Sequence, residues 1–184
     1  MAESTKKTTN VNVCVRCRPL NDAEKASGAG GTVKCDTANK TVTLTTGKGE
    51  KKMSKSFQFD KVFGAYSTQS EVFDTTVRPI VDEVLEGYNS TLFAFGPTGT
   101  GKTHTMEGEI SDPEMAGIVP RSVRLILEKL EAGKSEYTVR VSFLELYNEE
   151  LLDLLVDPTE KKAKPLRLCE DINKGVVCQN LEEV

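Results

Sequence analysis

The spacing of hydrophobic and polar positions changes several times along the chain, and each change predicts a different element. Apolar and polar residues alternate from Val11 to Arg18, which predicts a strand that ends at Pro19. The polar, glycine-rich stretch 22–31 predicts a loop. Short β-rich segments follow at residues 32–35, 41–45 and 56–59, and together they predict a small antiparallel meander.

From residue 68 the apolar positions recur at helical spacing. Thr68, with Glu71 three residues later, is the signature of a capped helix start. Pro79 interrupts this pattern and predicts a kink, and Gly87 predicts the end of the helix. A second helix is predicted to begin at Pro120 and to stop at Gly133.

The rest of the chain alternates between strand and helix patterns. The remaining predictions are a disordered tail at 1–10, apolar strands at 91–95 and 137–147, a short helix at 149–155, a polar linker at 157–164, and final strands at 166–169 and 176–181. This alternation predicts an α/β fold within one domain.

Composition narrows the class of protein. The 184 residues carry a formal net charge of -4, so no overall field attracts the chain to nucleic acid or to anionic lipid. The apolar runs are too short for a membrane helix, and residues 1–10 lack the apolar stretch of a signal peptide. We therefore expect a cytoplasmic protein with neither a nucleic acid nor a membrane as its partner.

The five cysteines do not suggest a disulfide framework. Cys14 and Cys17 have C-x-x-C spacing, but they fall within a predicted strand, where residues three apart face opposite sides. The chain has a single histidine, His104, far away in sequence. We expect reduced, mostly buried thiols rather than a redox pair or a zinc site.

One glycine-rich segment carries clear chemistry. It matches G-x-x-x-x-G-K-[ST] in full, with the residues Gly96, Pro97, Thr98, Gly99, Thr100, Gly101, Lys102 and Thr103. Glycines let backbone N–H groups converge on a β-phosphate, Lys102 can reach the β- and γ-phosphates, and the Thr103 hydroxyl can bind Mg²⁺. The motif follows an apolar strand pattern, so it predicts a site for a nucleoside triphosphate with Mg²⁺.

Several further motifs fall in one order along the chain. They are Arg16-Cys17-Arg18-Pro19, Phe93-Ala94-Phe95-Gly96, His104-Thr105-Met106-Glu107-Gly108, Gly117-Ile118-Val119-Pro120-Arg121 and Val141-Ser142-Phe143-Leu144-Glu145-Leu146-Tyr147-Asn148-Glu149. With the glycine-rich loop 95 residues into the chain, this set resembles the kinesin motor domain over nearly the whole sequence. Tyr147-Asn148-Glu149-Glu150-Leu151, followed by Asp153-Leu154-Leu155, is most similar to the bipolar mitotic (BimC-type) kinesins.

The resemblance implies a P-loop NTPase with a kinesin-type central sheet flanked by helices. It also implies ATP and Mg²⁺ as cofactors, microtubules as the partner, and a place on the cytoskeleton, in the spindle for the BimC type. Arg16, Arg18 and Pro19 would border the adenine, and His104 would pack on the base. Pro97 stands where kinesins usually carry Gln, early in the loop, and we expect ATP binding to survive this change.

The resemblance also implies segments that these residues do not contain. Kinesins have an N-x-x-S-S-R-S-H and a D-x-x-G switch, and neither occurs in the 184 residues, so no catalytic residue is identified. We therefore expect residues 11–184 to be the N-terminal part of an incomplete motor domain, poorly stable and not a competent motor alone. Oligomerisation would come from an absent stalk. The weak candidates for tubulin contact are Lys161, Lys162, Lys164 and Lys174.

Two alternatives stay open on the sequence alone. The chain could be a complete P-loop phosphotransferase in which Glu145, at the end of an apolar strand, or else Asp153, is the acidic residue of the Mg²⁺ site. It could also be a module that binds ATP or microtubules without hydrolysis.

Overall fold

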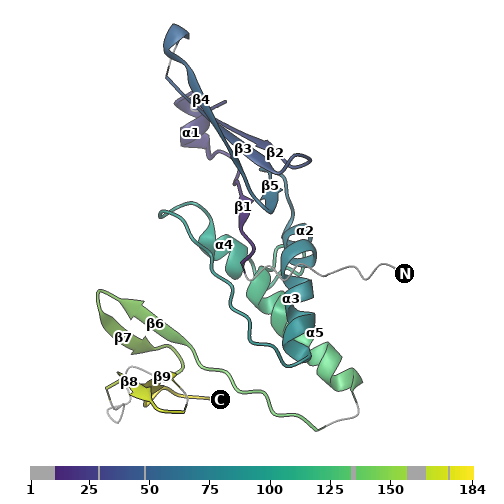
Figure 1. Ribbon diagram of the computed structural model, residues 1–184, viewed down its shortest axis with the longest axis vertical. Coiled ribbons are helices and arrows are strands. Elements are labelled where there is room, and N and C mark those ends of the chain that lie inside the picture. Colours follow the sequence, from purple (N-terminus) through teal and green to yellow (C-terminus); the bar gives the residue numbers. More distant parts are fainter. Residues whose placement is uncertain (1–10, 29, 48, 134–135, 157–164, 174) are drawn as a thin grey trace. The chain divides into compact units, whose positions relative to one another are not determined.

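The computed structural model spans residues 1–184 and divides into two compact units, residues 1–133 and 134–184. Figure 1 shows the order of the helices and strands along the chain. The structure describes residues 11–28, 30–47, 49–133, 136–156, 165–173 and 175–184. The predicted tail at 1–10 and the linker at 157–164 lie outside these ranges, and the two units are taken separately below.

The first unit begins with a pair of parallel strands. Strand β1 (Cys14–Arg16) pairs with β5 (Lys61–Phe63), with Val15 opposite Val62. The backbone of Cys17 extends the pair by donating to the Phe63 carbonyl at 2.9 Å. The predicted strand at 11–18 is therefore confirmed, over a shorter span.

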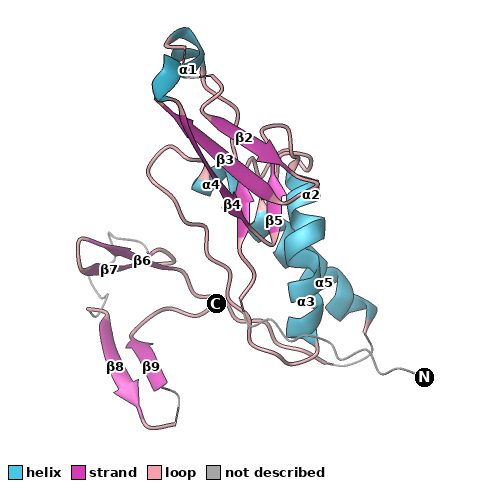
Figure 2. Ribbon diagram, turned by 45° about the horizontal axis from the view of Figure 1, so that its top comes forward, coloured by secondary structure: helices cyan, strands magenta, loops and turns pink. Residues whose placement is uncertain are grey.

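Strands β2 (Val33–Asp36), β3 (Thr41–Thr46) and β4 (Met53–Gln58) form the predicted antiparallel meander, seen side by side in Figure 2. A 3₁₀ turn, η1 (Gly49–Lys51), precedes β4. One face is mostly apolar, and Val42 lies buried there between its two cross-strand partners. On the other face Thr43 and Thr45 bond to serines of β4 at 2.7 and 3.0 Å, which explains the alternation in the sequence.

Part of the predicted loop at 22–31 is helical, so that prediction was wrong there. Helix α1 (Asp22–Ala26) begins at Asn21, whose side chain accepts a hydrogen bond from the backbone N–H of Glu24. The Glu24 carboxylate accepts one from the N–H of Asn21 in return, which completes a capping box. The glycines that follow dominated the composition of the stretch and concealed this local start signal.

The predicted helix from residue 69 onward is present in three parts, α2 (Gln69–Val72), the π-helical turn η2 (Phe73–Val77) and α3 (Arg78–Leu85). Thr68 caps it by accepting from the N–H of Glu71 at 3.1 Å, as predicted. Pro79 stands in the first turn of α3 and has no N–H, and the wider turn before it takes up the interruption. Gly87, at φ +101°, follows the helix end as expected.

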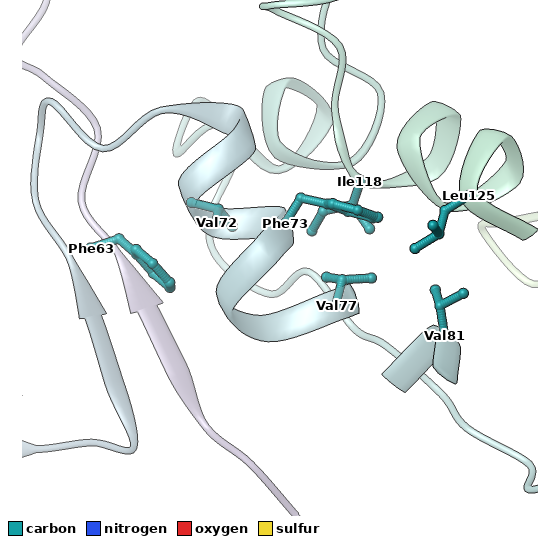
Figure 3. Packing of buried hydrophobic residues seen from close by; sticks show 7 residues of the cluster. All are labelled: Phe63, Val72, Phe73, Val77, Val81, Ile118 and Leu125. Carbon is teal, nitrogen blue, oxygen red and sulfur yellow. The ribbon is translucent and has the colours of Figure 1, made fainter. Parts of the chain in front are cut away.

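A second helix packs on these segments to form the core of the unit. Helix α5 (Ile118–Ala132) begins two residues before the predicted Pro120 and stops at Gly133. Figure 3 shows the buried cluster, which consists of Phe63, Val72, Phe73, Val77, Val81, Ile118 and Leu125. An ion pair of 2.6 Å between Lys129 and Asp82 joins α5 to α3.

The apolar segment 91–95 is not a strand, contrary to prediction. A strand requires a hydrogen-bonded neighbour, and within the described ranges no segment pairs with this one. Leu92 packs against the buried cluster, whereas Phe93 and Phe95 are 86% and 98% exposed. The residues enter the glycine-rich loop as extended chain anchored on one side.

The second unit consists of two antiparallel hairpins. Strands β6 (Leu144–Tyr147) and β7 (Glu150–Asp153) form the first, so the long strand predicted at 137–147 is confirmed only at its end. The helix predicted at 149–155 was wrong. Asn148 and Glu149, at φ +49° and +66°, make a two-residue turn with left-handed conformations, which reverses the chain into β7.

The final strands were predicted correctly. Strands β8 (Arg167–Asp171) and β9 (Gly175–Gln179) pair in antiparallel register, with Cys169 opposite Val177. Two backbone hydrogen bonds of 2.8 and 3.0 Å connect Val141 and Val184 within this unit.

All five cysteines are free thiols. Cys14 is exposed and the other four are half-buried, so the expected burial is wrong for Cys14. Burial, together with the neighbouring Cys35 thiol, raises the pKa of Cys17 to about 12. None of the helices in the described part of the chain has the length and apolar character needed to cross a membrane.

Candidate nucleotide-binding site

The glycine-rich loop leads directly into helix α4 (Lys102–Met106). Gly101, at φ +96°, lies immediately before the helix, and this left-handed conformation strongly favours glycine. A Cβ on Gly96 would lie 2.7 Å from the Thr100 hydroxyl oxygen. The two glycines are therefore required by the shape of the loop itself.

Lys102 reaches back across the loop. Its Nζ donates to the carbonyls of Gly96 at 2.8 Å and Pro97 at 3.0 Å. The Pro97 carbonyl also accepts from the Thr100 hydroxyl at 2.8 Å. The contribution of Pro97 to the loop is thus a carbonyl, which proline retains, and not the N–H, which it lacks.

Three side chains at the loop and in α4 are exposed and available to a ligand. These are Thr98, Thr103 and His104. Among the described residues, neither the Thr103 hydroxyl nor the His104 imidazole has a hydrogen-bond partner, whereas most polar groups nearby do. An unpartnered hydroxyl directly after the loop lysine fits a Mg²⁺ ligand, and a free imidazole face fits the stacking of a base.

Arg18 connects the segment after β1 with the loop. Its Nε donates to the Gly99 carbonyl at 2.8 Å, and its Nη1 donates to the carbonyl of the adjacent Pro19 at 2.9 Å. The two Nη atoms also bind the carboxylate of Glu24 at 2.7 and 2.6 Å. This bidentate contact raises the pKa of Arg18, and with the backbone N–H of Asn21 it lowers the pKa of Glu24 to about 2.

Arg16 points to a different set of partners. Its Nη1 donates to Gln69 at 2.8 Å and to the Thr105 hydroxyl at 3.0 Å, and its Nη2 donates to the Ser67 carbonyl at 3.2 Å. Burial lowers the pKa of its guanidinium. The structure thus brings Arg18 to the loop, with Pro19 next to it in the chain, and it brings Arg16 to α4 and α2. The predicted contact of Arg16 with adenine stays a prediction.

Gln69 is a supporting residue that could not be predicted from the sequence. It is only 4% exposed, and its Nε2 donates to the carbonyls of His104 at 2.6 Å and Met115 at 3.1 Å. Its Oε1 accepts from Arg16. One buried amide therefore joins β1, α2, α4 and the loop before α5. No motif marks it, because its partners are mostly backbone atoms distant in sequence.

The other residues singled out in the sequence belong to residues 134–184, the second unit. Glu145 is an exposed residue of β6 in the second unit. Both carboxylate oxygens of Asp153 accept backbone N–H groups, from Leu155 at 3.0 Å and Glu182 at 2.7 Å, which gives Asp153 a structural role. Within the described ranges no three His, Cys, Asp or Glu residues gather as metal ligands. The lysines at 161, 162, 164 and 174 lie outside those ranges.

A glycine-rich loop with the G-x-x-x-x-G-K-[ST] motif that enters a helix, among alternating strands and helices, is typical of P-loop NTPase folds. The family model of the kinesin motor domain matches residues 16–184. The chain belongs to the kinesin motor family.

Relatives and a solved structure agree with this assignment. The chain is 45% identical to kinesin-like protein KIN-5A of Oryza sativa subsp. japonica over 192 residues, and 45% identical to kinesin-like protein KIF11 of Mus musculus over 195 residues. These alignments cover 96% and 100% of this chain but 18% of each relative, so the chain spans about a fifth of their length. The predicted similarity to the BimC-type, or kinesin-5, group is confirmed.

The chain also matches a solved structure, and it covers a larger share of that structure than of the two relatives. A solved structure described as that of a fast kinesin superposes with a TM-score of 0.84 at 38% identity. The match covers 95% of this chain and 48% of the other, and it confirms an incomplete kinesin-type α/β fold.

Proposed function

We propose that the chain is the ATP-binding part of a microtubule motor that couples ATP hydrolysis to movement along microtubules in the spindle. The observation that carries the proposal is the loop 96–103, which enters α4 with Lys102 directed across it. Family membership supports it, and the description of the matched fast kinesin names both an ATPase mechanism and interactions with microtubules.

In this proposal each loop residue has a definite task. The backbone N–H groups of the loop surround the β-phosphate of ATP. Lys102 exchanges its two carbonyl partners for the β- and γ-phosphate oxygens, which bind an ammonium more strongly because they are charged. The Thr103 hydroxyl holds Mg²⁺, which neutralises phosphate charge when bound.

In the same proposal, the adenine base lies beside His104 and Pro19. The exposed His104 ring stacks on the adenine, and Pro19 borders it from the segment that Arg18 fastens to the loop. Arg16 supports the same region through its hydrogen bonds to Gln69 of α2 and Thr105 of α4.

Titration of a fluorescent ADP into the full-length protein tests the nucleotide site. We expect saturable, Mg²⁺-dependent binding that Lys102→Ala abolishes. Lys34→Ala, which removes an exposed lysine from β2, is the matched control and should bind normally. An unmodified protein without affinity for ADP would refute the proposal.

The function beyond binding requires a second assay. Co-sedimentation with microtubules that weakens at high salt, together with microtubule-stimulated ATP hydrolysis, is the expected result. Phosphate transfer to a small acceptor would instead support a phosphotransferase. Microtubule binding without ATP turnover would support a non-hydrolysing module.

A further inference from the structure

The Glu24 carboxylate takes part both in the cap of helix α1 and in an ion pair with Arg18. Its Oε2 accepts the N–H of Asn21 at 2.9 Å, which caps helix α1, and it also accepts Nη1 of Arg18 at 2.7 Å. Its Oε1 accepts Nη2 of Arg18 at 2.6 Å. Because the helix cap fixes the carboxylate, the paired bonds fix the plane of the Arg18 guanidinium.

The third nitrogen of that guanidinium is bound to the phosphate-binding loop. Arg18 Nε donates to the Gly99 carbonyl at 2.8 Å, across 81 residues of sequence. In a trans peptide the C=O of Gly99 and the N–H of Thr100 point in opposite directions. A donor that holds the Gly99 carbonyl therefore also sets the direction of the Thr100 N–H, which makes a long bond of 3.4 Å to the Pro97 carbonyl.

We propose that Glu24 is a positioning residue of the nucleotide site: through Arg18 it sets the direction of the Gly99–Thr100 peptide and thereby of one N–H group that faces the phosphates. This inference rests on the proposed nucleotide binding. The long bond from Thr100 to Pro97 is weak, so that N–H is easily given up to a phosphate oxygen.

A simpler role for Glu24 would be the stability of α1 alone. Substitution by Gln separates the two roles, because glutamine also serves at this position of a capping box. Glu24→Gln keeps the cap but loses the charge and the paired acceptor geometry. Asp22→Asn is the matched control, since it makes the same chemical change in the first turn of α1 at a carboxylate whose one partner among the described residues is Lys25.

The experiment measures the affinity for fluorescent ADP and the melting temperature without nucleotide, in the full-length protein. We expect Glu24→Gln to weaken ADP binding about fivefold, the order expected for one well-oriented, partly exposed ion pair, with little change in melting temperature. Asp22→Asn should change neither. In an Arg18→Lys background, which has no planar guanidinium, Glu24→Gln should have no further effect on ADP binding.

Each other outcome is decisive. Unchanged ADP affinity in Glu24→Gln would overturn the positioning role while leaving nucleotide binding intact, and so would an equal loss in the Arg18→Lys background. A lower melting temperature with unchanged affinity would assign Glu24 to helix stability alone. Failure of the unmodified protein to bind ADP would refute the proposed function and this inference with it.

Discussion

Replacement of Gln69 by leucine tests whether one buried amide holds the elements around the loop together. Leucine has a similar volume and is compatible with a helix, so the change removes hydrogen bonds without opening a large cavity. The variant loses the bonds from Nε2 to the carbonyls of His104 and Met115 and the bond accepted from Arg16. These are the contacts that join β1, α4 and the loop before α5 to α2.

The size of the effect follows from what is left behind. Each of the three lost bonds removes about 1 kcal/mol, and the Met115 carbonyl keeps its bond from the N–H of Glu109, so few groups are left without a partner. Arg16 keeps its bonds to Thr105 and Ser67, which limits the loss on that side. We therefore expect the free energy of unfolding to fall by about 3 kcal/mol, or the melting temperature by about 6–12 °C.

Urea unfolding followed by circular dichroism measures this loss. Ser70→Ala, the next residue on α2, removes only an exposed bond to Asp74 and should change stability by less than about 0.5 kcal/mol. Gln69→Glu keeps an acceptor for Arg16 but turns an oxygen toward the two carbonyls, so it should destabilise as well. A loss below about 1 kcal/mol in the leucine variant would show that the network contributes little.

Three further results follow from the loop and its supports. At Gly101 a Cβ would meet open space, but the φ of +96° is unfavourable for alanine. Gly101→Ala should therefore lower the free energy of unfolding in urea by about 1–2 kcal/mol and weaken ADP binding. Unchanged stability and ADP affinity would mean that the loop adopts another conformation. Pro97→Gln keeps the carbonyl that Lys102 and Thr100 use, so ADP affinity should stay within about twofold, and a larger change in titration would assign proline a role of its own. Glu24, with its pKa lowered to about 2, contributes a small stability, because solvent screens its ion pair with Arg18; that contribution is complete above its unfolded value near 4.5 and is lost as the pH falls toward 2. The free energy of unfolding should therefore vary less with pH across this range in Glu24→Gln than in the unmodified protein. The same variation with pH in both proteins would contradict the lowered pKa of Glu24.

The sequence predicted best where a single local interaction decides the outcome. The loop 96–103, the Thr68 cap and the meander were all correct, because each depends on residues close together in the chain. The segment 91–95 failed for the opposite reason, since a strand exists only with a neighbour and apolar residues alone do not supply one. The helix predicted over strand β7 was wrong because the leucine pairs at 151–152 and 154–155 fit either period, and the turn at 148–149 decides between them.

The same distinction separates the parts of the site. The residues proposed to bind phosphate are contiguous and form one motif, but the residues that hold them in place come from other elements. Arg18 reaches the loop from 81 residues away, and Gln69 reaches the His104 carbonyl from 35 residues away. A motif match therefore specifies which atoms can bind phosphate. The directions of those atoms depend on hydrogen bonds from residues distant in sequence, which no local pattern predicts. If that reasoning is correct, loop variants will change the chemistry of binding, and variants of the distant residues such as Glu24→Gln and Gln69→Leu will change affinity or stability with every loop residue intact.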